Sequence, residues 1–270
     1  MKSFAKIIAS VALTTLLGSC AEHKPPLVKT SKKAVAKPQV QVQPVQRNFY
    51  IPPNIPLGQR TVADVLELYG TYAESQLKPY FNKAQVTYPP SAITFIALKQ
   101  EKTLELWAKD NNSGFRFIRD YPIQAASGFA GPKLRQGDKQ VPEGIYRITG
   151  LNPNSHYHLS MRINYPNEFD RFHAWQEGRK NLGSDIFIHG SDRSIGCLAM
   201  GDAAIEELFV LTAQVGADNA KIVIAPHDPR TYSLEADTAT QPEWTAELYA
   251  SITREVNTLT PAMKSANSSL

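Results

Sequence analysis

The stretch IFIHGSDRSIGC, residues 186–197, decides how this chain is interpreted. Its first three residues are β-branched or aromatic, so they predict a short strand that delivers His189. The glycine, serine, aspartate and arginine residues that follow predict a loop, and the loop ends at Cys197, one of only 2 cysteines. A cysteine nucleophile needs a nearby imidazole to accept its proton, and this pair would supply both groups. A buried structural cysteine that happens to follow a histidine is the alternative.

The residues around this pair predict where each group would stand. We expect His189 to end a strand, and Cys197 to start or directly precede a helix predicted over residues 201–216. The free N–H groups and the dipole of a helix N-terminus favour a thiolate. The same N–H groups, with Gly196 giving close access, could hold the oxyanion of a tetrahedral intermediate. The stretch therefore predicts an acyl-transfer site.

Hydrophobic patterns on both sides of this stretch predict a mainly β domain of the α+β class with a few packed helices. Apolar residues recur at helical spacing after Thr61, which forms an N-terminal capping pattern with Asp64. Two more helical patterns lie at residues 201–216 and 242–259. Strand patterns bounded by turn residues lie at 93–98 and 103–109 and within 115–133, 141–151, 156–166, 185–191 and 221–228.

The first residues have the three parts of a bacterial lipoprotein signal peptide. Lys2 and Lys6 precede an apolar run over residues 7–17, which is too short to span a bilayer and leads into Leu-Gly-Ser before Cys20. This pattern resembles a lipobox and implies that Cys20 is lipidated; an ordinary cleaved signal peptide is the alternative. Ala21 stands where an inner-membrane retention aspartate would stand, so resemblance to Gram-negative lipoproteins implies a periplasmic protein anchored at the outer membrane.

The composition of the 270 residues predicts one globular domain with appendages. The net charge of +4 is mild, so we expect no nucleic-acid partner. Trp107, Trp175 and Trp244 are interpreted as core aromatics. The sequence predicts five parts: a lipoprotein signal peptide (1–20), a disordered tether rich in lysine, proline and glutamine (21–58), an N-terminal packing helix region (59–88), the domain that holds the His/Cys pair (89–228) and a C-terminal helical extension (229–270).

Residues from about 90 to 227 resemble the L,D-transpeptidase (YkuD-type) catalytic domain. The signature of that family is a histidine and a glycine, a variable loop, and then serine, glycine, cysteine and an aliphatic residue. The matching residues here are His189, Gly190, Ser194, Gly196, Cys197 and Leu198, and upstream Gly137, Asp138, Lys139, Pro142, Glu143, Gly144 and Tyr146. The segment 152–170 is similar to the YafK-like branch of the family.

The resemblance implies a β-sandwich-like catalytic fold and a role for each matching residue. Cys197 is the expected nucleophile and His189 the general base, while Ser194 and Gly196, with Gly190, shape the oxyanion loop. The thiol mechanism requires no cofactor. Ile195 and Ala199, which stand where many members have histidine and arginine, follow the YafK-like branch. Some relatives in that branch hydrolyse the bond between a lipoprotein and peptidoglycan, so crosslinking and hydrolysis both stay open.

Other polar residues are candidates for substrate contact. We expect His158 to line the substrate cleft or pack against it, and Arg162 and Tyr165 to contact a stem-peptide carboxylate, the alternative for Arg162 being a solvated or ion-paired side chain. His156 and His158, spaced to share one strand face, could form a metal site with a further histidine. That further ligand would be His173 or His227.

Two more charged pairs allow more than one interpretation. Asp138 and Glu143 could be paired carboxylates for glycoside hydrolysis, but a loop-ordering role is favoured because they lie in a turn-rich segment. Asp192 and Arg193 could orient His189 or simply pair with each other within the loop.

Three classes of function follow from these patterns. The first is an exported, lipid-anchored cysteine acyl-transfer enzyme that acts on peptidoglycan stem peptides, either as a transpeptidase or as a hydrolase that releases a protein, such as a murein-linked lipoprotein, or a peptide from diaminopimelate. The second is a non-catalytic peptidoglycan-binding lipoprotein. The third, a metal-dependent peptidase, rests only on the histidines.

Overall fold

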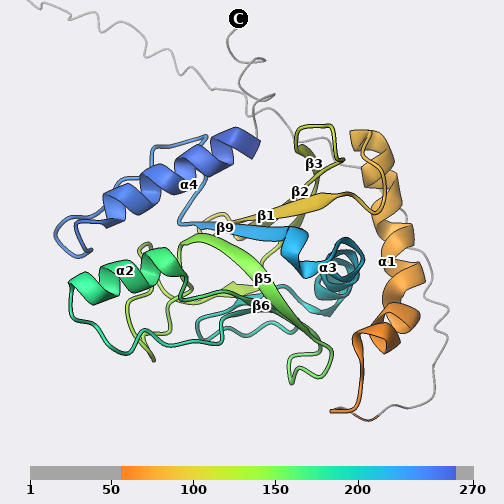
Figure 1. The fold of residues 1–270 in the computed structure, drawn as a ribbon, viewed down its shortest axis with the longest axis horizontal. Coiled ribbons are helices and arrows are strands. Elements are labelled where there is room, and N and C mark those ends of the chain that lie inside the picture. The colour runs from red at the N-terminus through yellow and green to blue at the C-terminus, as the bar shows by residue number, and fades with distance from the viewer. Residues whose placement is uncertain (1–55, 57, 260–270) are drawn as a thin grey trace, which may run out of the picture. The chain divides into compact units, whose positions relative to one another are not determined.

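The computed structural model describes residue 56 and residues 58–259, whose arrangement is shown in Figure 1. The predicted signal peptide, Cys20, nearly all of the predicted tether and residues 260–270 lie outside the described residues. The elements follow one another as α1 (Val62–Ala84), β1 (Ala92–Leu98), β2 (Thr103–Lys109), β3 (Arg116–Pro122), β4 (Ala125–Ala126), β5 (Gly144–Asn152), β6 (Ser160–Ile163), α2 (Glu168–Gln176), β7 (Phe187–His189), β8 (Leu198–Ala199), α3 (Asp202–Val215), the 3-10 helix η1 (Ala217–Asn219), β9 (Ala220–Ala225) and α4 (Thr245–Leu259). Among the helices described here, none combines the length and apolar character needed to cross a bilayer.

The strands form one mixed sheet in the order β3-β2-β1-β9-β5-β6-β7-β8-β4. Neighbours are antiparallel except for β1 with β9 and β7 with β8, which are parallel. Strand β5 joins the two halves of the sheet, because residues 144–147 pair with β9 and residues 148–152 pair with β6. A register shift between Ile148 and Gly150 marks the point where one pairing passes to the other, and such shifts bend a strand. The predicted α+β class, a β-rich domain with packed helices, is confirmed.

Helices cover both faces of the first half of the sheet. Phe95 and Ile222 belong to a core that includes α1 and α3, whereas Ile96 and Val223 face the opposite way and pack in a second cluster with α4. Figure 1 shows α1 and α3 together and α4 on the other side of β1 and β9. Because both faces are covered, these strands are apolar at almost every position instead of alternating.

Helix α1 forms where the sequence predicts it. Thr61 and Asp64 make a complete capping box, in which each side chain accepts the other residue's backbone N–H. The face of α1 that packs on α3 buries Leu77 and Phe81 completely. The helix is therefore part of the same hydrophobic core as the sheet.

Helix α2 was not predicted, and its exposed face corrects one expectation. The helix is short and begins with a capping box between Asn167 and Asp170. Its buried face is narrow and includes His173. Trp175 lies on the opposite face and is 76% exposed, so its assignment to the core was wrong. Trp107 is buried as expected.

A substitution in α1 tests whether this helix is a structural part of the domain. Leu77→Ala removes a fully buried side chain between α1 and the core, and we expect it to lower the free energy of unfolding by about 2–5 kcal/mol. Lys78→Ala, on the exposed face of the same turn, removes only an ion pair with Glu74 and is expected to cost less than about 0.5 kcal/mol. Urea unfolding followed by tryptophan fluorescence measures both, and equal midpoints for the two variants would show that α1 folds apart from the sheet.

Candidate active site

His189 and Cys197 line one cavity of about 320 Å³. The other lining residues come from the end of β5, from the turn that follows it, and from the first residues of β6 and β7. They are Asn152, Asn154, Ser155, His156, Tyr157, Ser160 and Phe187. The two residues of the predicted nucleophile–base pair are thus brought to the same hollow.

Parallel pairing of β7 and β8 positions both groups. Ile188 pairs with Leu198 and His189 with Ala199, so His189 is the last residue of β7 and Cys197 directly precedes β8. The expectation that Cys197 starts or directly precedes a helix was wrong, because β8 intervenes and α3 begins only at Asp202. The dipole of α3 is therefore not applied directly at the sulfur, since the effect of a helix dipole fades within its first turn.

The imidazole of His189 is buried and held in one orientation. Its Nδ1 lies 2.6 Å from the carbonyl oxygen of Gly190, which can only accept, so Nδ1 carries the proton and Nε2 is left as an acceptor in the neutral ring. The ring of Tyr157 covers it, with the ring centroids 4.6 Å apart. Burial lowers the pKa of His189, and the hydrogen bond to Gly190 offsets part of that effect. His189 is thus a neutral base at pH 7.

The thiol of Cys197 is half-buried. Burial raises its pKa, the backbone hydrogen bond from Phe187 and the positive charge of Lys133 lower it, and the negative charge of Asp185 raises it further. The net direction is upward, so Cys197 rests as a thiol at neutral pH. The site therefore holds a neutral thiol and a neutral imidazole, not a preformed ion pair.

The loop between the two residues is held by hydroxyl groups. The Ser194 hydroxyl donates to the carbonyl oxygen of Cys197 at 2.6 Å. The backbone N–H of Gly196 donates to Oγ of Ser127 at 2.6 Å, and the two serine hydroxyls lie 3.2 Å apart. Sequence reasoning missed Ser127, which follows β4 and lies 67 positions before Ser194.

The start of the same loop is closely packed. A Cβ atom at Gly190 would lie 2.6 Å from both Oδ1 of Asp202 and the carbonyl oxygen of Tyr157, so no larger residue fits without movement. Oδ1 of Asp202 also accepts the backbone N–H of Ser191 at 2.8 Å. Among the contacts of the described residues, Asp192 meets the hydroxyl of Ser191, and neither Asp192 nor Arg193 contacts His189.

His158 lies outside the lining of the cavity, in the turn before β6. Its backbone has a φ of 71°, and its Nε2 is 2.9 Å from Oε1 of Glu206 on α3. The ring of Tyr69 on α1 meets it edge-on. Strand β6 begins only at Ser160, so His156 and His158 do not share a strand face as the sequence suggested.

Arg162 and Tyr165 are engaged elsewhere as well. Arg162 forms a salt bridge of 3.0 Å with Asp185. The buried Tyr165 hydroxyl lies within hydrogen-bond distance of the carbonyl oxygens of Lys133 and Leu182, at 3.2 and 3.1 Å. Neither side chain lines the cavity of Cys197.

The two upstream carboxylates order the loop before β5. Asp138 binds Lys133 and accepts backbone N–H groups of residues 134, 135 and 140, and these bonds lower its pKa although burial opposes them. Glu143 is buried and contacts Lys99 at 2.9 Å and the hydroxyl of Tyr249 on α4 at 2.9 Å. The two carboxylates serve separate networks, which fits the loop-ordering interpretation.

The histidines do not gather into a metal site. Within residues 56 and 58–259, no three histidine, cysteine or acidic side chains lie close enough together to hold an ion. His173 instead stacks on Trp244, with ring centroids 4.7 Å apart.

Comparisons with known proteins agree with this geometry. Residues 92–224 match the family model of the L,D-transpeptidase catalytic domain, YkuD. Over 113 residues the chain is 39% identical to the Escherichia coli K12 protein named "Putative L,D-transpeptidase YafK", and the O157:H7 protein of that name matches equally. The matched segment covers 41% of this chain and 43% of each relative, so the chain spans less than half the length of these relatives.

The similarity to solved structures is more distant. The helical cell shape determining protein Pgp2 of Campylobacter jejuni is 20% identical, with a TM-score of 0.42 over 58% of this chain and 56% of that one. Bd1075 of Bdellovibrio bacteriovorus is 20% identical, with a TM-score of 0.37 over 63% and 57%. The family match and the sequence identity to YafK carry the assignment: residues 92–224 form a catalytic domain of the L,D-transpeptidase (YkuD) family, of the YafK-like branch.

Proposed function

We propose that this protein is a cysteine-dependent acyl-transfer enzyme that acts on peptide stems of peptidoglycan. Cys197 is the nucleophile and His189 the general base. The observation that carries the proposal is that parallel strands β7 and β8 place these two residues on one cavity within a domain of the L,D-transpeptidase family. No cofactor takes part in the proposed reaction.

The protonation states suit a reaction that begins from neutral groups. As Sγ of Cys197 attacks a stem carbonyl carbon, Nε2 of His189 accepts the thiol proton. The tetrahedral intermediate then expels an amine, which takes that proton from His189, and a thioester remains on Cys197. Attack on the thioester by an amine gives a new amide bond, and attack by water gives a carboxylic acid; either returns the thiol.

The loop residues support this chemistry by fixing the backbone around Cys197. The Ser194 hydroxyl donates a hydrogen bond to the carbonyl oxygen of Cys197. Gly190 has no side chain, so Asp202 of α3 can approach the loop closely. The N–H of Gly196 points into the same part of the loop and donates to Ser127. We propose that Gly196 serves the oxyanion, which would then replace the Ser127 hydroxyl as the acceptor of this N–H.

Transpeptidation is the first assignment and hydrolysis the alternative. A YafK-like hydrolase would release a protein or peptide from diaminopimelate, and it would differ from a transpeptidase only in that water attacks the thioester. A non-catalytic peptidoglycan-binding lipoprotein is the second alternative. It would bind sacculi without any requirement for Cys197.

We further propose that the protein is exported and lipid-anchored at Cys20, in the periplasm at the outer membrane. The basic start, the apolar run and the lipobox-like residues of the first twenty positions support this proposal. Residues 21–58 would then be a tether, followed by an N-terminal packing helix region (59–88), the catalytic domain (89–228) and a C-terminal helical extension (229–270).

Substitution of the two proposed reacting residues tests the enzyme assignment. Purified protein is incubated with tetrapeptide-stem muropeptides and with lipoprotein-linked muropeptides, and products and adducts are identified by mass spectrometry. We expect a thioester adduct on Cys197, complete loss of turnover in Cys197→Ala, and a loss of about 10²–10⁴-fold in His189→Ala, because the general base is removed. His227→Gln, which changes a histidine that does not line the cavity, serves as the matched control.

The products of that experiment separate the alternatives. New muropeptide dimers identify a transpeptidase, and release of the linked peptide identifies a hydrolase. Turnover that survives in Cys197→Ala would rule out the cysteine mechanism. Binding to sacculi without any adduct or product would favour the non-catalytic lipoprotein.

The pH dependence of thiol alkylation tests the neutral resting state. With Cys20→Ser, Cys197 is the only thiol, and its rate of reaction with iodoacetamide follows the thiolate fraction. Burial raises the pKa of Cys197, so the thiolate is stabilised less in the folded chain than in the unfolded one. We therefore expect the alkylation midpoint to lie at higher pH in the native protein than in the same protein in urea. A native midpoint below the denatured one would indicate a thiolate–imidazolium pair instead.

A further inference from the structure

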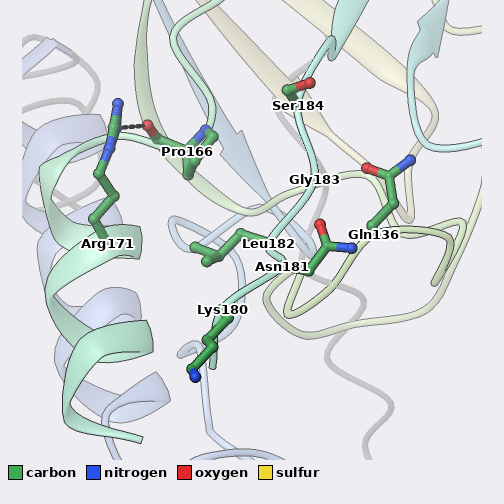
Figure 2. A pocket seen from close by; sticks show the side chains of 8 residues that line it. All are labelled: Gln136, Pro166, Arg171, Lys180, Asn181, Leu182, Gly183 and Ser184. Carbon is green, nitrogen blue, oxygen red and sulfur yellow. Dashed lines mark hydrogen bonds between the residues drawn. The ribbon is translucent and has the colours of Figure 1, made fainter. Parts of the chain in front are cut away.

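Figure 2 shows a second hollow, of about 470 Å³, which shares no lining residue with the cavity of Cys197. It is lined by the first turn of α2 and a proline two positions before that helix, by the segment leading to β7, and by one residue of the loop before β5. The lining residues are Gln136, Pro166, Arg171, Lys180, Asn181, Leu182, Gly183 and Ser184. Nothing in the proposed reaction mechanism uses these residues.

The charged residues that line this hollow are all positive. Arg171 and Lys180 are its two charged lining residues, and no carboxylate lines it. Within the described part of the chain, neither cation forms a salt bridge; the guanidinium of Arg171 donates to the carbonyl oxygen of Pro166, as Figure 2 shows. Exposed cations that line a hollow without acidic partners attract an anionic group.

Two acidic side chains near this hollow in the sequence are already engaged: Glu177 pairs with Arg179, and Asp185 pairs with Arg162. Glu168, three positions before Arg171 on α2, is exposed and does not line the hollow. The amide side chains of Gln136 and Asn181 add hydrogen-bond donors to the lining, on the side away from Arg171 in Figure 2. Donors and positive charge together suit a carboxylate.

The hollow lies within peptide reach of the thiol. Ser184 lines the hollow and Phe187 lines the cavity of Cys197, three positions further along the same segment. Three residues of extended chain span at most about 10 Å, so a bound peptide that runs along this segment covers the distance with two or three residues. Arg162, the cation first considered for a stem carboxylate, is bound to Asp185 instead.

We propose that this hollow binds a free carboxylate of the peptide stem, two or three residues away from the carbonyl that Cys197 attacks. This inference rests on the proposed function, since it assigns the substrate a second anchoring point. Arg171 and Lys180 supply the charge, and Gln136 and Asn181 supply neutral donors. The subsite would select stems whose carboxylates are free over stems in which they are amidated.

Binding in the absence of chemistry tests the subsite. The full chain carrying Cys197→Ala is titrated with a soluble tetrapeptide-stem muropeptide, once with free carboxylates and once with the carboxylates converted to amides. In that background we expect Arg171→Gln and Lys180→Gln each to weaken binding of the free-carboxylate probe about three- to tenfold, because each removes a charged contact. Lys83→Gln, an equal charge change at an exposed position of α1, is the matched control and should leave the affinity unchanged.

The outcomes separate this inference from the proposed function. Equal affinity for the free and amidated probes, no binding of either probe, or equal affinity of the Lys180→Gln and Lys83→Gln variants would overturn the subsite. Adduct formation on Cys197 is measured in parallel with the unsubstituted cysteine. An adduct together with charge-independent binding leaves the enzyme and removes the subsite, whereas charge-dependent binding without an adduct or turnover leaves the subsite and removes the enzyme.

Discussion

The site depends on a parallel pairing between two very short strands, β7 and β8. Only residues 190–197 connect them, whereas parallel neighbours normally need a crossover of a dozen residues or more. So short a connection cannot carry a helix back across the sheet. It must turn tightly, which places φ at 61° for Ser191 and 104° for Gly196, and it must be held from outside. The holding groups are Ser127 at one end of the loop and Asp202 at the other.

The same packing sets the electrostatics of the pair. The imidazole of His189 is buried under Tyr157, and the thiol of Cys197 is half-buried beside Phe187. The charged form of each group is therefore disfavoured, because it would lose solvation by water. Burial pushes the two pKa values apart in the directions that favour the neutral forms. If Cys197 and His189 react as we propose, the thiol stays weakly reactive until a substrate carbonyl is in place, since proton transfer to His189 then accompanies bond formation.

Hydrophobic periodicity predicted the parts of the fold that are long and strongly patterned. Helices α1, α3 and α4 and most strands lie where the sequence places them, because each buries a regular apolar face or is apolar throughout. Helix α2 was not predicted because it is short and its buried face is narrow, although the Asn167–Asp170 capping box marks its start. The turn at His158 was not predicted, because the residue with the positive φ is a histidine and no glycine marks the turn in the sequence.

For the candidate site too, the sequence predicted features of neighbouring residues but not contacts between segments that lie far apart in the chain. The family signature allowed His189 and Cys197 to be paired from the sequence. The strand after Cys197 could not be predicted, because a two-residue strand has no periodicity to detect. Ser127 could not be found at all, since its contact with Gly196 is created only when β4 pairs with β8.

The loop after β4 therefore links several parts of the site. It supplies Ser127 to the turn before Cys197 and Lys133 to the electrostatic field at the thiol, and Gln136 lines the cationic hollow. Lys99 and Glu143 fix this loop against the sheet and α4. Because one ordered loop contacts the turn before Cys197 and also lines the cationic hollow, a change in its position would alter the surroundings of the thiol and that hollow together.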